Sequence, residues 1–105
     1  MIKNLTPTEA VELLKENNTR LIDVRESWEF EIARVEGSEL MPMSNFYRHM
    51  QALRQDENLL IICHHGVRSL SICALLIDNN FKNVINLEGG IEAWSQQVDP
   101  SIPLY

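Results

Sequence analysis

The seven residues 63–69, Cys-His-His-Gly-Val-Arg-Ser, are the part of the chain best suited to chemistry. Cys63 follows the apolar run 59–62, which is typical of a strand covered on both faces, and precedes a helical pattern over 70–77. A cysteine in such a tight loop faces the unpaired N–H groups of the loop and of the helix N-terminus. These groups favour the thiolate, which is the nucleophilic form. The sequence therefore predicts a reactive cysteine.

Two neighbours strengthen this prediction. Gly66 permits a backbone conformation that other residues resist, and Arg68 adds a permanent cation near the helix start. We expect Cys63 to be substantially ionised at neutral pH. The alternative is that Cys63 is a small core residue, as free cysteines often are.

The other polar side chains of the segment have weaker assignments. Ser69 is expected at or near the N-cap of the helix, in a structural role. His64 and His65 could bind donor or acceptor groups, tune charge near neutral pH, or only shape the rim of the loop. Adjacent histidines beside one cysteine lack the spacing of a structural zinc site, so we predict no metal and no cofactor.

The elements that would position this loop alternate between strands and helices. Strands are expected over 21–24, 59–62 and 84–87, with a short extended piece at 40–42. Helices are expected from a capping box at Thr6 and Glu9, and over 28–33, 44–53, 70–77 and 91–98. This order predicts an α/β fold, a parallel sheet with helices on both faces, whose ligands bind beyond the carboxyl ends of the strands. Asp23 and Arg25 lie at such an end and could reach the loop.

Three segments resemble the signatures of rhodanese-like sulfurtransferases. Residues 63–69 are similar to the active-site loop of that family, residues 21–25 with 29–31 to its upstream signature, and residues 83–94 to its C-terminal one. Pro42 matches the proline after the second strand. The resemblance covers nearly the whole chain and implies a rhodanese-like fold, with a five-stranded parallel sheet flanked by helices.

The resemblance also implies an activity. Cys63 would take sulfane sulfur from a small donor such as thiosulfate or a persulfide, carry it as a persulfide, and pass it to a thiol or protein acceptor. The loop residues that would bind substrate are His64, His65, Gly66, Val67, Arg68 and Ser69. Asp23 is expected to brace the fold by hydrogen bonds, with Arg25 in support.

Two alternatives remain open. A noncatalytic binding or sensing module could share this fold. Related phosphatases and arsenate reductases have a similar loop, but with five residues between cysteine and arginine, where this chain has four between Cys63 and Arg68. The shorter loop favours a cysteine that carries one extra sulfur over a cradle for a tetrahedral oxyanion.

Composition limits the remaining possibilities. The chain has 105 residues, a formal net charge of −6 and a hydrophobic fraction of 45%. We expect one domain over residues 1–105. The acidic balance argues against nucleic acid and anionic membranes. The N-terminal residues have no signal-peptide pattern, which predicts a cytoplasmic location where Cys63 and Cys73 stay reduced. Cys73, within a helical pattern, is expected to be a buried free thiol.

Overall fold

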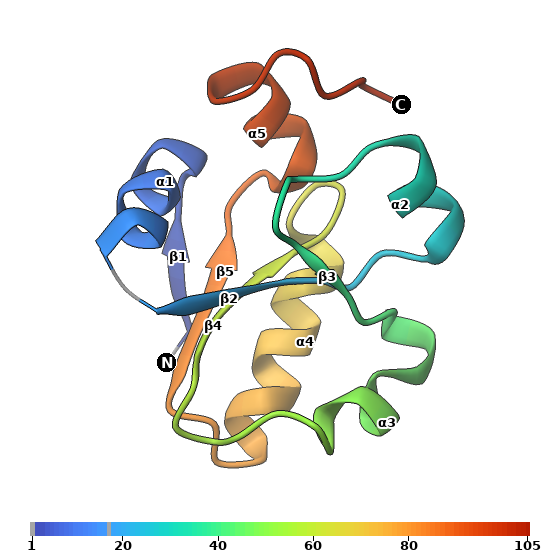
Figure 1. Cartoon of the computed structure of the whole chain (residues 1–105). Helices are drawn as coiled ribbons and strands as arrows, with labels where there is room; N and C mark the ends of the chain where they lie inside the picture. Colours follow the sequence, from blue (N-terminus) through green and yellow to red (C-terminus); the bar gives the residue numbers. More distant parts are fainter. Residues whose placement is uncertain (1, 17) are drawn as a thin grey trace.

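A five-stranded parallel sheet forms the centre of the computed structural model, which describes residues 2–16 and 18–105 (Figure 1). The strands lie in the order β1-β5-β4-β2-β3, so β4 is central. The expected α/β architecture is confirmed. The strands are β1 Lys3–Leu5, β2 Thr19–Asp23, β3 Glu39–Leu40, β4 Asn58–Ile62 and β5 Asn83–Leu87. The helices are α1 Pro7–Glu16, α2 Ser27–Ile32, the 3₁₀ turn η1 Met43–Asn45, α3 Phe46–Met50, α4 Val67–Asp78 and α5 Gly90–Gln97.

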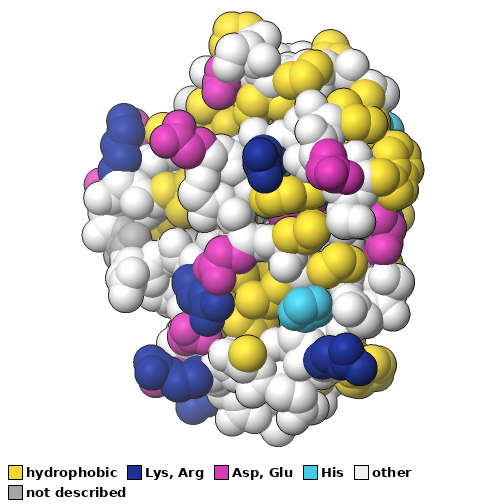
Figure 2. Space-filling view, turned by 45° about the vertical axis from the view of Figure 1, so that its right-hand side comes forward, with side chains coloured by type: hydrophobic (Ala, Val, Ile, Leu, Met, Phe, Trp, Pro, Cys, Tyr) yellow, Lys and Arg dark blue, Asp and Glu magenta, His cyan; other side chains and the backbone are white. Residues whose placement is uncertain are grey.

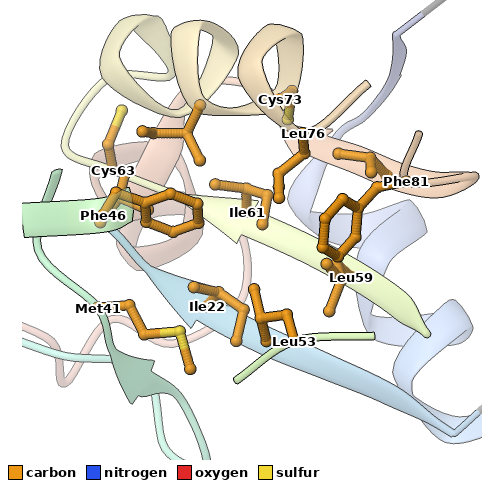
Figure 3. Packing of buried hydrophobic residues seen from close by; sticks show 13 residues of the cluster. Ile22, Met41, Phe46, Leu53, Leu59, Ile61, Cys63, Cys73, Leu76 and Phe81 are labelled. Carbon is orange, nitrogen blue, oxygen red and sulfur yellow. The ribbon is translucent and has the colours of Figure 1, made fainter. Parts of the chain in front are cut away.

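Two apolar clusters cover the two faces of the sheet. Alternation along β4 sends Leu60 and Ile62 to one face and Leu59 and Ile61 to the other. The first cluster includes residues of α1 and α5, and the second includes residues of α3 and α4. Figure 3 shows the second cluster, with Phe46 and Leu76 closing over Ile61. Burial on both faces explains why β4 is a continuous apolar run.

Local sequence signals set the helix ends. The Thr6 amide donates to the Glu9 carboxylate at 2.9 Å, and the Glu9 amide donates to the Thr6 hydroxyl at 3.3 Å, so the predicted capping box is present. Helix α4 ends at Asp78 with Asn79 as its C-cap, and Asn80 adopts a left-handed φ of 68°. Asparagine tolerates this conformation better than most residues.

Two elements differ from the prediction. Strand β1 was not predicted from the residue pattern, because three residues carry too little periodicity. The helix expected over 44–53 is shorter, since η1 precedes α3 and α3 ends at Met50. After α3 the backbone forms tighter turns in which each amide donates to the carbonyl three residues back. The Ala52 amide donates to the His49 carbonyl and the Leu53 amide to the Met50 carbonyl.

Helix α5 packs its N-terminus directly against the loop that follows β4. The amide of Ile91 donates to the Cys63 carbonyl at 2.8 Å, and that of Glu92 donates to the His64 carbonyl at 3.2 Å. Gly90 makes this approach possible. Its φ is +61°, and a Cβ atom there would overlap the carbonyl groups of His64 and Cys63.

We predict that Gly90→Ala lowers the free energy of unfolding by about 3 kcal/mol, since strain and a backbone clash add together. Gly37→Ala is the matched control, because Gly37 also has a positive φ, +85°, but no atom within 4 Å of an added Cβ. It should cost only about 1 kcal/mol. Urea unfolding of the two variants measures the difference, and equal losses would contradict the close approach.

Candidate active site

Cys63 lies one residue beyond β4, at the carboxyl edge of the sheet. The alternation of the strand continues through it, so its side chain shares the α4 face with Leu59 and Ile61. Figure 3 shows Cys63 at one end of this cluster, beside Phe46. Only 1% of the residue is exposed. The loop therefore shields Cys63 from bulk water.

Two polar groups meet the Cys63 sulfur. The Gly66 amide donates to Sγ at 3.1 Å, and the Ser69 hydroxyl lies 3.2 Å from Sγ. The left-handed φ of Gly66, +98°, turns the chain back toward the sulfur before α4 begins at Val67. The positive end of the α4 dipole thus lies at the same place. This environment stabilises an anionic sulfur.

Ser69 lies near the N-cap of α4, as predicted, but it does not cap the helix. Gly66 is the N-cap, and Ser69 is the third helical residue, with its side chain turned inward. Its hydroxyl donates to Asn86 Oδ1 at 2.5 Å, and Asn86 Nδ2 donates to the Gly66 carbonyl at 3.3 Å. A hydroxyl has one proton, so a neutral Cys63 would donate to Ser69, whereas a thiolate would attract the Ser69 proton.

Sequence reasoning missed Asn86, which fixes both Ser69 and the carbonyl of Gly66. It lies on β5 between Ile85 and Leu87 and is buried. A buried polar side chain needs a partner. A polar residue inside an apolar strand was therefore the available signal.

Arg68 is held by a carboxylate that the sequence did not identify as part of the site. Its Nη1 and Nη2 donate to Glu29 Oε1 and Oε2 at 2.6 and 2.8 Å, a bidentate pair. The Arg68 guanidinium lowers the pKa of the buried Glu29 carboxyl to about 2, and Glu29 in turn raises the pKa of Arg68. The cation predicted beside the cysteine is present, but its charge is compensated.

Asp23 and Arg25 form a second, fully buried pair. Arg25 Nη2 donates to Asp23 Oδ2 at 2.7 Å and to the Ala33 carbonyl at 2.6 Å, which ties the end of β2 to the segment after α2. Arg25 Nη1 donates to the Tyr105 hydroxyl at 2.6 Å, and that hydroxyl donates to Glu29 Oε2 at 2.9 Å. Tyr105, which sequence reasoning missed, joins the two ion pairs.

His64 and His65 stand outside the sulfur contacts. The His64 ring stacks between Tyr105 and His65, with centroid distances of 4.1 and 3.9 Å. Burial lowers the pKa of His64, with a further contribution from His65, so this ring is neutral at pH 7. His65 Nε2 lies 3.4 Å from Glu92 Oε1.

Among the described residues, His64, His65 and Glu92 could offer three metal-ligand atoms within 4.8 Å of one another. The two imidazole rings are only 13° from parallel. Their in-plane lone pairs therefore run side by side and do not converge on one ion. One ring would have to turn before both could bind a metal.

Cys73 is a chemically different thiol. It is fully buried on α4, as expected, and burial raises its pKa to about 12, with a smaller contribution from Cys63. It stays protonated at neutral pH and serves as an internal control for Cys63.

Within the part of the chain that is described, none of the helices is both long and apolar enough to cross a membrane.

Comparison with protein families gives a match over residues 6–97 to the family described as "Rhodanese-like domain". Thiosulfate sulfurtransferase GlpE of Pseudoalteromonas translucida is 26% identical over 92 residues, which cover 88% of each chain. The rhodanese-like/PpiC domain-containing protein 12 of Arabidopsis thaliana is 38% identical over 93 residues. That match covers 85% of this chain but 31% of the Arabidopsis protein, so the chain spans about a third of this relative.

A solved structure supports the same relationship. The rhodanese-like domain protein of Staphylococcus aureus superimposes with a TM-score of 0.83 at 27% identity, covering 99% of both chains. The two proteins therefore share their fold over nearly the whole chain.

The Glu29–Arg68 pair makes stability depend on pH in a defined direction. The pKa of Glu29 is depressed in the folded state, so its contribution is complete above about pH 4.3, where a free glutamate ionises, and is lost as pH falls toward 2. We predict that Glu29→Gln lowers the free energy of unfolding by about 3 kcal/mol at pH 7, and that this difference shrinks below pH 4.3.

Urea unfolding at several pH values measures this dependence. Glu31→Gln is the matched control, because Glu31 is exposed on the same helix and should change stability by less than about 0.5 kcal/mol at every pH. A Glu29→Gln difference that does not change with pH would contradict the assigned ion pair.

Proposed function

The chain belongs to the rhodanese-like domain family, and on that premise we propose that it is a sulfurtransferase that carries sulfane sulfur on Cys63. One observation carries the proposal. The Cys63 sulfur lies at the start of α4, where it accepts a hydrogen bond from the Gly66 amide and lies 3.2 Å from the Ser69 hydroxyl oxygen. These surroundings are suited to an anionic sulfur that forms and breaks one bond.

The proposed cycle has two steps. With thiosulfate as donor, the Cys63 thiolate attacks the outer sulfur, the S–S bond of the donor breaks, and sulfite leaves with the bonding electrons. Cys63 then carries a persulfide. An acceptor thiolate attacks the terminal sulfur, the persulfide bond breaks, and the Cys63 thiolate returns while the acceptor becomes the persulfide.

The surroundings of Cys63 support both steps. Sulfur is anionic before the first step and in the persulfide after it, so donors that stabilise negative charge act in both resting states. When the sulfur is anionic, the Ser69 proton can turn from Asn86 Oδ1 toward the sulfur, which lies 3.2 Å from the same oxygen. Arg68 positions the loop through Glu29, and His64 and His65 form the rim where donor and acceptor arrive.

The alternatives are less well supported. A binding module without chemistry has no need of a cysteine sulfur that accepts a backbone hydrogen bond at the start of a helix. The loop keeps four residues between Cys63 and Arg68, which disfavours a phosphatase or arsenate reductase. A cytoplasmic location and a single domain over residues 1–105 stay predictions from the sequence.

We predict that the protein gains the mass of one sulfur atom after prolonged incubation with excess thiosulfate. Intact-mass spectrometry measures the gain, which a reducing agent should reverse. Cys63→Ser should gain nothing, because serine cannot form a persulfide, whereas Cys73→Ala should load like the wild type. A sulfur gain that survives in Cys63→Ser, or that is lost only in Cys73→Ala, would contradict the proposal.

A further inference from the structure

We propose that Cys63 takes sulfur preferentially from donors that carry one negative charge or none and an apolar group, such as organic persulfides with apolar substituents, over the thiosulfate dianion. This inference rests on the proposed function, because it specifies the donor for the same cysteine. It follows from how charge and apolar surface are distributed around the loop.

The cation closest to Cys63 along the chain is already occupied. Both terminal nitrogens of Arg68 donate to the Glu29 carboxylate, and the pair is bidentate at 2.6 and 2.8 Å. Tyr105 donates to the same carboxylate and so holds it in place. A compensated pair has little net field, and a dianion gains little attraction from it.

Arg25 and the two histidines of the loop do not replace Arg68. Arg25 is fully buried and paired with Asp23. His64 is neutral at pH 7, since burial lowers its pKa, and His65 faces the Glu92 carboxylate.

The lysines are at the opposite end of the sheet. Lys3 begins β1, Lys15 lies in the last turn of α1 shortly before β2, and Lys82 precedes β5. All three are therefore close to the amino ends of the parallel strands, whereas Cys63 lies at the carboxyl edge.

Several exposed side chains beside the loop, apart from the two histidines, are instead apolar. Val67, within the loop motif, is 72% exposed, and Leu70, one turn further along α4, is 41% exposed. Trp28 is 59% exposed and meets the edge of Tyr105, whose ring stacks on His64. Figure 2, which brings the side of α2 and α3 forward, shows hydrophobic side chains among well-separated charged ones. An apolar group on the donor would be buried against such a rim.

The chemistry is the same for either donor class. With a persulfide R–S–SH, the Cys63 thiolate attacks the outer sulfur, the S–S bond breaks, and R–S⁻ leaves while the proton stays on the transferred sulfur. With benzenethiosulfonate, the outer sulfur is transferred in the same way and benzenesulfinate leaves. Benzenethiosulfonate differs from thiosulfate by one charge and an apolar ring, so it is a suitable probe.

The first test compares kcat/KM for benzenethiosulfonate and thiosulfate with one thiol acceptor. We expect benzenethiosulfonate to be favoured on the order of tenfold or more, and kcat/KM for thiosulfate not to fall as salt is raised. A preference for thiosulfate, or a steep fall of its kcat/KM with salt, would overturn the inference.

The second test places a free cation on the rim. Val67→Lys should raise kcat/KM for thiosulfate on the order of tenfold, make it fall with salt, and lower the preference for benzenethiosulfonate. Gln97→Lys adds the same charge at the exposed end of α5 and should leave both donors unchanged. Equal effects of the two variants would overturn the inference.

The two proposals fail differently. If neither donor adds sulfur to Cys63, the sulfurtransferase proposal fails. If both donors load Cys63 but thiosulfate is preferred by the wild type, only the donor inference fails.

Discussion

The contact between the Gly66 amide and the Cys63 sulfur is the interaction on which the rest of the site depends. It requires a chain that leaves the central strand, turns back through a left-handed glycine and enters α4 within four residues. The fold supplies each condition. Strand alternation directs Cys63 toward the α4 face, and Gly66 makes the turn. The first amides of α5 donate hydrogen bonds to the carbonyl groups of Cys63 and His64. The amide is therefore oriented before any substrate arrives, which is how preorganised donors stabilise charge most effectively.

A second layer of polar contacts fixes this loop from several elements. Asn86 on β5 holds Ser69, Glu29 on α2 holds Arg68, and Tyr105 connects Glu29 with Arg25 at the end of β2. These groups are buried or half-buried and hydrogen-bonded to one another, so the loss of one would leave a partner unsatisfied. The same pairing that holds the loop also neutralises its arginine. The Glu29–Arg68 pair thus holds the loop in place, but it leaves Arg68 little net charge with which to attract an anion.

The sequence predicted those features that depend on local patterns. Apolar periodicity located β4, α4 and the loop between them, and the capping box located the start of α1. Glu29, Asn86 and Tyr105 were missed because their partners lie 39, 17 and 80 residues away along the chain, and only the folded chain brings them together. Ser69 was expected at or near the N-cap, where its hydroxyl could bond a free N–H group, whereas in the structure the hydroxyl contacts Asn86 and the Cys63 sulfur instead. Hydrophobic periodicity predicts helices and strands. Hydrogen bonds between side chains of different elements leave no local pattern in the sequence.

We infer that the Gly66 amide and the N-terminus of α4 make the Cys63 sulfur a reactive nucleophile in the folded protein. The most direct measurement is the rate of alkylation by iodoacetamide at pH 7, in a Cys73→Ala protein so that one thiol reacts. We expect Cys63 to be alkylated faster in the folded protein than in the same chain unfolded in urea. Alkylation that requires unfolding, or that is no faster in the folded protein, would contradict this inference.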